Sequence, residues 1–172
     1  GDEQLNDDAV MKIADMMKTL DRLKKISGSL LLISRIENEQ FVKSDNIQPL
    51  QLLNEVTEEI SHRLEEKKLS ISINLNESKT IKGVNHDLLF QLFYNLINNA
   101  IKYNVNNGSI SISDEESGKG QYTITIKDTG IGIPAEELPF IFDRFRKANL
   151  GQNVGYGLGL SIVKSIALYH GI

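Results

Sequence analysis

Asp128-Thr129-Gly130-Ile131-Gly132-Ile133-Pro134 is the stretch around which the rest of the chain is organised. It follows residues 122–127, whose alternation of apolar and polar side chains is typical of a half-buried strand. A carboxylate thus stands at the end of a strand, where it can accept hydrogen bonds from a ring amine. The glycines after it permit a close approach of the backbone to a flat ligand. Asp-Thr-Gly is also a common turn, so the neighbouring segments must decide between the two interpretations.

The composition limits the classes of protein that the chain can represent. With 172 residues, of which 40% are hydrophobic, it can form one domain with a long appendage or two small domains. The net charge of −4 gives no general attraction to nucleic acid, so we expect no nucleic-acid partner. The absence of cysteine excludes disulfides and cysteine-based metal sites. The longest purely apolar run, residues 30–33, is too short to span a bilayer, which favours a soluble fragment.

The first part of the chain, residues 6–40, has the periodicity of one long helix. Its apolar residues step by three and four positions along one stripe, which comprises Val10, Ile13, Met17, Leu20, Leu23 and Leu30. A helix of this length needs packing partners along its whole length. This favours an arm of a coiled coil or a four-helix bundle, whereas the alternative is a core helix of the domain that follows.

The remaining segments predict a mixture of helices and strands. Residues 41–48 form a polar connector, at which the arm should end and a domain begin. Amphipathic periodicity predicts a helix at 50–67, and a shorter helix is expected at 135–142. The segments expected as strands are 69–75, 80–83, 109–113 and 122–127. The last two should form a hairpin across residues 114–120.

A helix predicted at 85–103 carries an unusual polar face. Leu89, Phe93 and their apolar neighbours lie on one side, whereas Asn95, Asn99 and Lys102 lie on the other. Asparagine is a mediocre helix former, and solvated helix faces favour glutamate and lysine. Asparagine oxygens can coordinate Mg²⁺, and a lysine can meet a phosphate. The alternative is an exposed face that happens to be rich in asparagine.

Two further stretches carry chemistry in the last third of the chain. A basic cluster interleaved with aromatic residues contains Arg144, Arg146 and Lys147. Gly155-Tyr-Gly-Leu-Gly-Leu160 then opens a helix expected at 160–169, and glycines before a helix N-terminus can form an anion site. A flexible loop is the alternative. The segment lacks the preceding strand of a dinucleotide fingerprint and the Gly-Lys-Ser/Thr of a Walker loop.

Four segments, in their order along the chain, resemble motifs of one family. They are Asn95-Leu-Ile-Asn-Asn-Ala-Ile-Lys-Tyr103, Asp128-Thr-Gly-Ile-Gly-Ile-Pro134, Ile141-Phe-Asp-Arg-Phe145 and Gly155-Tyr-Gly-Leu-Gly-Leu160. They look like the N box, the first glycine box, the F box and the second glycine box of the ATP-binding domain of sensor histidine kinases. The resemblance covers residues 45–172, whereas residues 1–44 look like the second helix of the dimerisation and phosphotransfer hairpin, with Leu31-Leu-Ile-Ser-Arg-Ile-Glu-Asn38 at its end.

The resemblance implies a role for each matching residue. Asp128 is expected to hydrogen-bond the adenine amino group, while Gly130 and Gly132 let the loop pass close to the base. Asn99, with Asn95 beside it, is expected to hold Mg²⁺ near the phosphates of ATP. The expected catalytic cations are Lys102, Arg144, Arg146 and Lys147. The nucleotide-binding set is completed by Lys102, Tyr103, Gly155, Gly157, Leu158 and Gly159.

The implied fold is α+β, a two-layer sandwich of three helices on a mixed sheet, preceded by the long helical arm. The implied activity is that of a protein-histidine kinase, in which the γ-phosphoryl of Mg-ATP moves to a histidine and then to a response regulator. We expect a homodimer in the full-length protein, with this portion in the cytoplasm and an anchor in the cell membrane. Two alternatives stay open, an ATPase of the same superfamily with a conformational role and a vestigial nucleotide-binding or dimerising module.

The sequence also departs from the family pattern. The phosphoacceptor histidine should precede an acidic residue and, a few positions later, a proline. His62, His86 and His170 are followed by Arg, Asp and Gly, so we expect all three to be surface or structural residues. The first helix of the hairpin is thus expected to be absent. The last two strands of the sheet are expected to be missing after residue 172.

Overall fold

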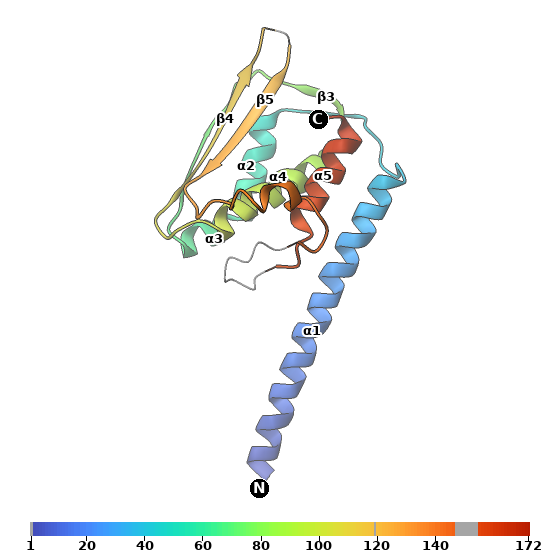
Figure 1. The fold of residues 1–172 in the computed structure, drawn as a ribbon, viewed down its shortest axis with the longest axis vertical. Coiled ribbons are helices and arrows are strands. Elements are labelled where there is room, and N and C mark those ends of the chain that lie inside the picture. The colour runs from blue at the N-terminus through green and yellow to red at the C-terminus, as the bar shows by residue number, and fades with distance from the viewer. Residues whose placement is uncertain (1, 119, 147–154) are drawn as a thin grey trace.

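The computed structural model describes residues 2–118, 120–146 and 155–172, with side chains from residue 7 onward (Figure 1). Its helices are α1 (Asp2–Glu37), α2 (Pro49–Glu59), α3 (Ser61–Glu66), α4 (His86–Lys102) and α5 (Gly159–His170), with a short 3₁₀ helix at Leu138–Phe140. Its strands are β1 (Asp45–Ile47), β2 (Ser70–Asn74), β3 (Ile81–Val84), β4 (Ser109–Glu116) and β5 (Tyr122–Asp128). The predicted α+β fold with a long N-terminal helix is confirmed.

The main sheet has the order β2-β4-β5 and is mixed, as predicted. β2 runs parallel to β4, and β4 pairs with β5 in the predicted hairpin, antiparallel, with Ile112 opposite Ile126. The arrangement of the other strands differs from the prediction. The connector at 41–48 contains β1, which pairs with β3 in a separate two-stranded sheet. A strand of three residues is too short to show the alternation by which strands are identified.

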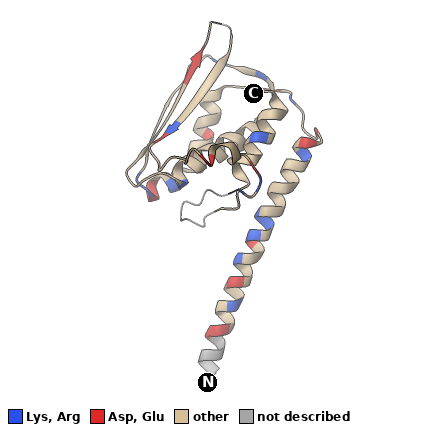
Figure 2. Ribbon diagram, viewed as in Figure 1, with Lys and Arg blue, Asp and Glu red and all other residues tan. Residues whose placement is uncertain are grey.

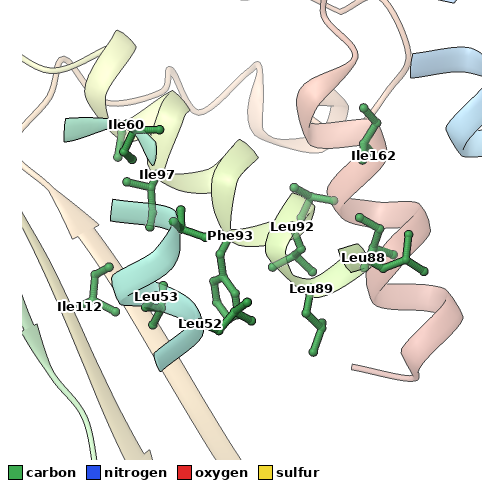
Figure 3. Close-up of a cluster of buried hydrophobic side chains, with 14 of the residues drawn as sticks. Leu52, Leu53, Ile60, Leu88, Leu89, Leu92, Phe93, Ile97, Ile112 and Ile162 are labelled. Atoms are coloured by element: carbon green, nitrogen blue, oxygen red, sulfur yellow. The ribbon is translucent and has the colours of Figure 1, made fainter. Parts of the chain in front are cut away.

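The core lies between the main sheet and the helices α2, α4 and α5, which cover the same side of it (Figure 1). Figure 3 shows Leu53 from α2, Ile97 from α4 and Ile162 from α5 in this cluster. Ile112 reaches the same cluster from β4, and its neighbour toward the strand start, Ile110, is also fully buried. Because α4 packs against the sheet and against both other helices, its remaining polar face is held in a fixed position.

The arm α1 extends away from the domain, with charged residues along its length (Figure 2). Its last turns belong to the domain, because Ile33 and Ile36 are buried in the core. Most of the predicted apolar stripe stays exposed, including Leu20 at 63%. This exposure is what a helix that awaits a packing partner would show. Of the helices among the described residues, none has both the length and the apolar character needed to cross a membrane.

The single helix predicted at 50–67 is wrong, because the chain breaks at Ile60 into α2 and α3. Ile60 has φ −106° and ψ 6°, which lies outside the helical range. The hydroxyl of Ser61 donates to the carbonyl of Glu58 at 2.8 Å. Serine offers the backbone such local alternatives to helical hydrogen bonds, which explains the break after α2.

The joint between the arm and the domain is held by hydrogen bonds from Asn85. Its side-chain oxygen accepts from Leu88 N at 3.0 Å and caps α4, while its Nδ2 donates to Val42 O at 3.0 Å. Its backbone N–H donates to Nε2 of His170 at 3.1 Å, and Nδ1 of His170 lies 3.0 Å from Ile166 O. His170 is therefore the neutral imidazole that accepts at Nε2 and donates at Nδ1. This is a structural role, as expected from the sequence.

The stability of the protein should fall as the pH falls, because of His170. Burial holds the pKa of His170 below its usual 6.5, and the nearby Lys43 lowers it further. The unfolded chain therefore takes up this proton first, so stability is fully present above about pH 6.5 and is lost as pH falls through the folded-state pKa. Urea unfolding at pH 7.5 and 5.5 measures the loss, which should be smaller in His170→Gln. His62→Gln, at an exposed position, should lose as much stability as the wild type does. An equal loss of unfolding free energy between pH 7.5 and 5.5 in all three proteins would contradict this role of His170.

Candidate nucleotide site

The polar face of α4 forms one wall of the site. Asn95 donates from Nδ2 to Gln91 O at 2.8 Å, so its amide is fixed along the helix. A Cβ atom placed on Gly159 would lie 3.1 Å from Asn95 Oδ1, which shows that this oxygen faces the start of α5. Asn99 follows one turn later on the same half-exposed face. Two amide oxygens are thus available on one face of a rigid helix.

The end of α4 brings a positive charge to the same wall. Lys102 donates from Nζ to the hydroxyl of Tyr103 at 2.6 Å and lies 4.3 Å from the centre of its ring. A Cβ atom placed on Gly155 would lie 2.8 Å from the same Nζ. The ammonium of Lys102 therefore stands between Tyr103 and the glycine-rich segment before α5, where an anion would meet it.

The loop after β5 forms the second wall. Asp128 accepts at Oδ1 from Gly130 N at 2.8 Å, which turns the chain sharply. Ile131 N donates to Tyr103 O at 3.1 Å and joins the loop to the end of α4. A Cβ atom on Gly130 would lie 2.5 Å from this carbonyl, so only glycine fits there. Asp128 is exposed, and its second oxygen is available to a ligand.

A polar network that the sequence analysis missed supports this second wall. Asn104 is 7% exposed, and its Oδ1 accepts from the hydroxyl of Thr129 at 3.0 Å. Thr129 Oγ1 accepts from Ser109 N at 2.8 Å, while Asn104 Nδ2 donates to Ser109 O at 3.2 Å. The network fixes the loop against both α4 and β4. Its only signal in the sequence was the position of Thr129 beside Asp128, because Asn104 falls just outside the helical pattern.

The glycine-rich segment before α5 closes the third side. Gly157 has φ +70°, and a Cβ atom on it would lie 2.5 Å from Arg146 O. The carbonyl of Gly157 accepts from Phe145 N at 2.8 Å, so the F-box segment is joined directly to the segment before α5. Leu158 is buried and apolar, so it cannot cap α5 with its side chain. Within the described residues no side chain caps the first N–H groups of α5, and an anion can be their partner.

The side chains of the two arginines in and just after the F box are each paired with a glutamate. Arg144 forms an ion pair with Glu37 at the end of the arm. Arg146 binds Oε2 of Glu137 through Nε at 3.1 Å and Nη2 at 2.8 Å. Lys147 lies outside the described residues. The structure thus brings the Lys102 ammonium to the site, whereas both arginine side chains are paired with glutamates, and their role at the γ-phosphate stays a prediction.

The helix predicted at 135–142 is wrong, because only Leu138–Phe140 is helical and of the 3₁₀ type. Hydrogen bonds run over three residues, from Glu137 N to Pro134 O at 2.9 Å and from Phe140 N to Glu137 O at 3.0 Å. Pro139 explains the difference, since it has no N–H to donate and disfavours the α conformation in the residue before it.

Together, the walls match the chemistry of a bound nucleotide. Asp128 offers an acceptor, Lys102 a positive charge and the start of α5 a row of N–H donors. The amide oxygens of Asn95 and Asn99 are ligands of the type that Mg²⁺ takes alongside phosphates and water. Among the described residues, no three histidine or acidic side chains gather into a metal site of their own. Gly132 is exposed, with nothing near the position of a Cβ atom.

Comparison with known proteins agrees with this geometry. A family model described as "Histidine kinase-, DNA gyrase B-, and HSP90-like ATPase" matches residues 84–172. The heme sensor protein HssS of Staphylococcus saprophyticus is 36% identical over 161 residues, which make up 92% of this chain and 34% of that protein. The chain thus spans about a quarter to just over a third of the length of the curated relatives it matches.

Solved structures share the fold. The histidine kinase AdeS of Acinetobacter baumannii has a TM-score of 0.70 at 24% identity, with 91% of this chain and 72% of that chain covered. Full-length ShkA in complex with AMPPNP has a TM-score of 0.74 at 25% identity, with 88% of this chain and 32% of that chain covered. Both alignments cover much more of this chain than the 89 residues of the family model, whose range is 84–172.

Proposed function

The chain belongs to the family of histidine kinase-, DNA gyrase B- and HSP90-like ATPases, and it contains the ATP-binding domain of a sensor histidine kinase. From this premise we propose that it binds Mg-ATP and provides the γ-phosphoryl group for a histidine that lies outside this chain. The observation that carries the proposal is the meeting of Asn95, Lys102, Asp128 and the start of α5 around one site. In support, the similar protein ShkA has been solved with the nucleotide AMPPNP.

The residues of this chain would bind and orient the nucleotide. Asp128 accepts a hydrogen bond from the adenine amino group, and the glycine at 130 lets the base lie close to the loop. Lys102 and the N–H groups of α5 hold the phosphates, which carry the charge that must be stabilised during transfer. The chemistry needs positioning and positive charge more than a covalent intermediate. Arg144, Arg146 and Lys147 are further candidates for contact with the γ-phosphate.

Asn99 and Asn95 would hold the metal. Bound Mg²⁺ neutralises phosphate charge and orients the transferred group. Asn95 Oδ1 fits this role because its own Nδ2 is already engaged by Gln91 O, which leaves the oxygen facing the glycine-rich segment.

Magnesium should raise the affinity of the wild type for ATP, and Asn99→Ala should remove most of that gain. We expect the affinity of Asn99→Ala for ATP in the presence of magnesium to be about tenfold lower than that of the wild type, or about 1.4 kcal/mol. Titrations of both proteins with and without magnesium measure that gain. Binding in EDTA should hardly change, because the base and phosphate contacts from this chain remain. Asn107→Ala, at an exposed position in the turn after α4, serves as the control and should keep the full gain. An equal magnesium effect in wild type and Asn99→Ala would remove Asn99 from the metal site.

The same proposal extends to partners. The exposed stripe of α1 would pack in a helical bundle with the first helix of its hairpin and with a second copy. The phosphoryl group would then pass to a response regulator. We place this portion in the cytoplasm of a protein anchored in the cell membrane. Incubation of the chain with γ-labelled ATP and a separately supplied hairpin helix that carries the histidine should label that helix. ATP hydrolysis without labelling would favour a conformational ATPase instead.

A further inference from the structure

Lys67 reaches the end of α4 from a neighbouring element. It follows α3, which lies beside the end of α4 (Figure 1). Its half-buried ammonium donates to three backbone carbonyls: Lys102 O at 2.7 Å, Ile101 O at 3.0 Å and Asn104 O at 3.3 Å. An ammonium has three donors, so every proton of Lys67 has an acceptor on one short stretch of backbone.

This stretch needs such a partner. The last carbonyls of an α-helix have no partner within the helix, and they form the negative end of its dipole. A lysine ammonium from elsewhere in the chain satisfies both needs at once. Because Lys67 binds carbonyls on both sides of Tyr103, it fixes the direction in which the chain leaves α4.

The backbone that Lys67 holds is the backbone that joins the two walls of the site. Tyr103 O accepts from Ile131 N at 3.1 Å, and the Asn104 side chain binds the Thr129 hydroxyl at 3.0 Å. Lys102, whose carbonyl is the nearest to Lys67, points its own ammonium toward Gly155. A shift of this backbone would therefore move the Lys102 ammonium and the Asp128 loop relative to one another.

We propose that Lys67 is a positioning residue of the nucleotide site. Its ammonium sets the end of α4 and, through it, the spacing between the phosphate-binding Lys102 and the base-binding Asp128. The inference rests on the proposed function for the identity of the ligand, but its structural part concerns this chain alone. Lys67 itself touches no ligand, because its three donors are occupied by the backbone.

Lys67→Met tests the proposal, because methionine keeps an unbranched side chain and removes the charge. Lys68→Met is the matched control: Lys68 is the next residue, is exposed and carries the same charge. In calorimetric titrations with ADP, we expect Lys67→Met to bind roughly tenfold more weakly, as misplaced binding groups do, and Lys68→Met to bind as wild type does. Equal affinity in all three proteins overturns the proposal.

Two further measurements separate positioning from mere stabilisation. Urea unfolding gives the folded fraction of each protein, and a loss of stability with unchanged affinity per folded molecule overturns the proposal. Amide hydrogen exchange without nucleotide should be faster at Ile131 in Lys67→Met than in Lys68→Met, since its acceptor, Tyr103 O, is no longer held. If the wild type binds no ADP, the proposed function fails, and exchange at Ile131 alone then decides whether Lys67 positions the loop.

Discussion

Asp128→Asn is expected to weaken ADP binding by about 1–3 kcal/mol, or roughly 5- to 150-fold. Oδ1 of Asp128 accepts from Gly130 N, and asparagine can keep that bond with its own oxygen. The substitution therefore preserves the turn and replaces only the second side-chain oxygen, Oδ2, with an NH₂ donor. A donor that faces the amino group of adenine leaves the hydrogen bond to the base unmade. Calorimetric titration with ADP measures the loss.

The control for this prediction is a matched loss of charge away from the site. Asp15→Asn on the exposed arm removes one carboxylate from a weak surface pair with Lys18. It should leave ADP affinity unchanged, because charges separated by more than about 10 Å of water are screened at ordinary salt. If Asp128→Asn binds ADP as tightly as Asp15→Asn does, Asp128 does not face the base.

Gly157→Ala is expected to destabilise the junction between the F-box segment and α5 by roughly 2–5 kcal/mol. A left-handed backbone costs a side chain about 1–2 kcal/mol, and overpacking adds about 1–3 kcal/mol. Both terms apply, since φ is +70° and the new Cβ atom would lie 2.5 Å from Arg146 O. The amide of Phe145, which donates to Gly157 O at 2.8 Å, should lose protection from hydrogen exchange. Nucleotide affinity should fall as well.

Gly83→Ala separates the cost of the left-handed backbone from the cost of overpacking. Gly83 has nearly the same φ, +69°, but nothing lies within 4 Å of the position of its Cβ atom. It should show the conformational cost alone, as a loss of global stability of about 1–2 kcal/mol with nucleotide affinity unchanged. If Phe145 stays as protected in Gly157→Ala as in wild type, the junction does not depend on the missing side chain.

The parts of the candidate site that could be predicted are those whose sequence pattern lies within a single helix, strand or loop. The Asp128 loop followed a clearly alternating strand, and the polar face of α4 contrasted with a regular apolar face around Leu89 and Phe93. Local periodicity determines both features, so they were found without tertiary information. The glycine-rich segment before α5 was predicted from the spacing of its glycines ahead of a helix, and the structure places Gly155 beside the Lys102 ammonium and Gly159 beside the Asn95 side-chain oxygen.

The missed features depend on contacts between distant residues. Lys67 stands in a run of charges that resembles any solvated helix end, and only the fold brings it to the carbonyls of α4. The pairing of Arg144 with Glu37 depends on the packing of the arm against the domain, and its expected role at a phosphate stays a prediction. β1 was missed because pairing with β3, rather than its own pattern, makes it a strand. Pattern reasoning cannot see such pairings.

The most direct test of the account is a titration of the wild-type chain with ADP and with GDP, each with magnesium. Adenine presents an amino group where guanine presents a carbonyl oxygen, and the carboxylate of Asp128 can accept a hydrogen bond only from the amino group. We predict saturable binding of ADP at one site and binding of GDP at least roughly tenfold weaker. Equal affinity for ADP and GDP, or binding of neither, would contradict an adenine site built around Asp128.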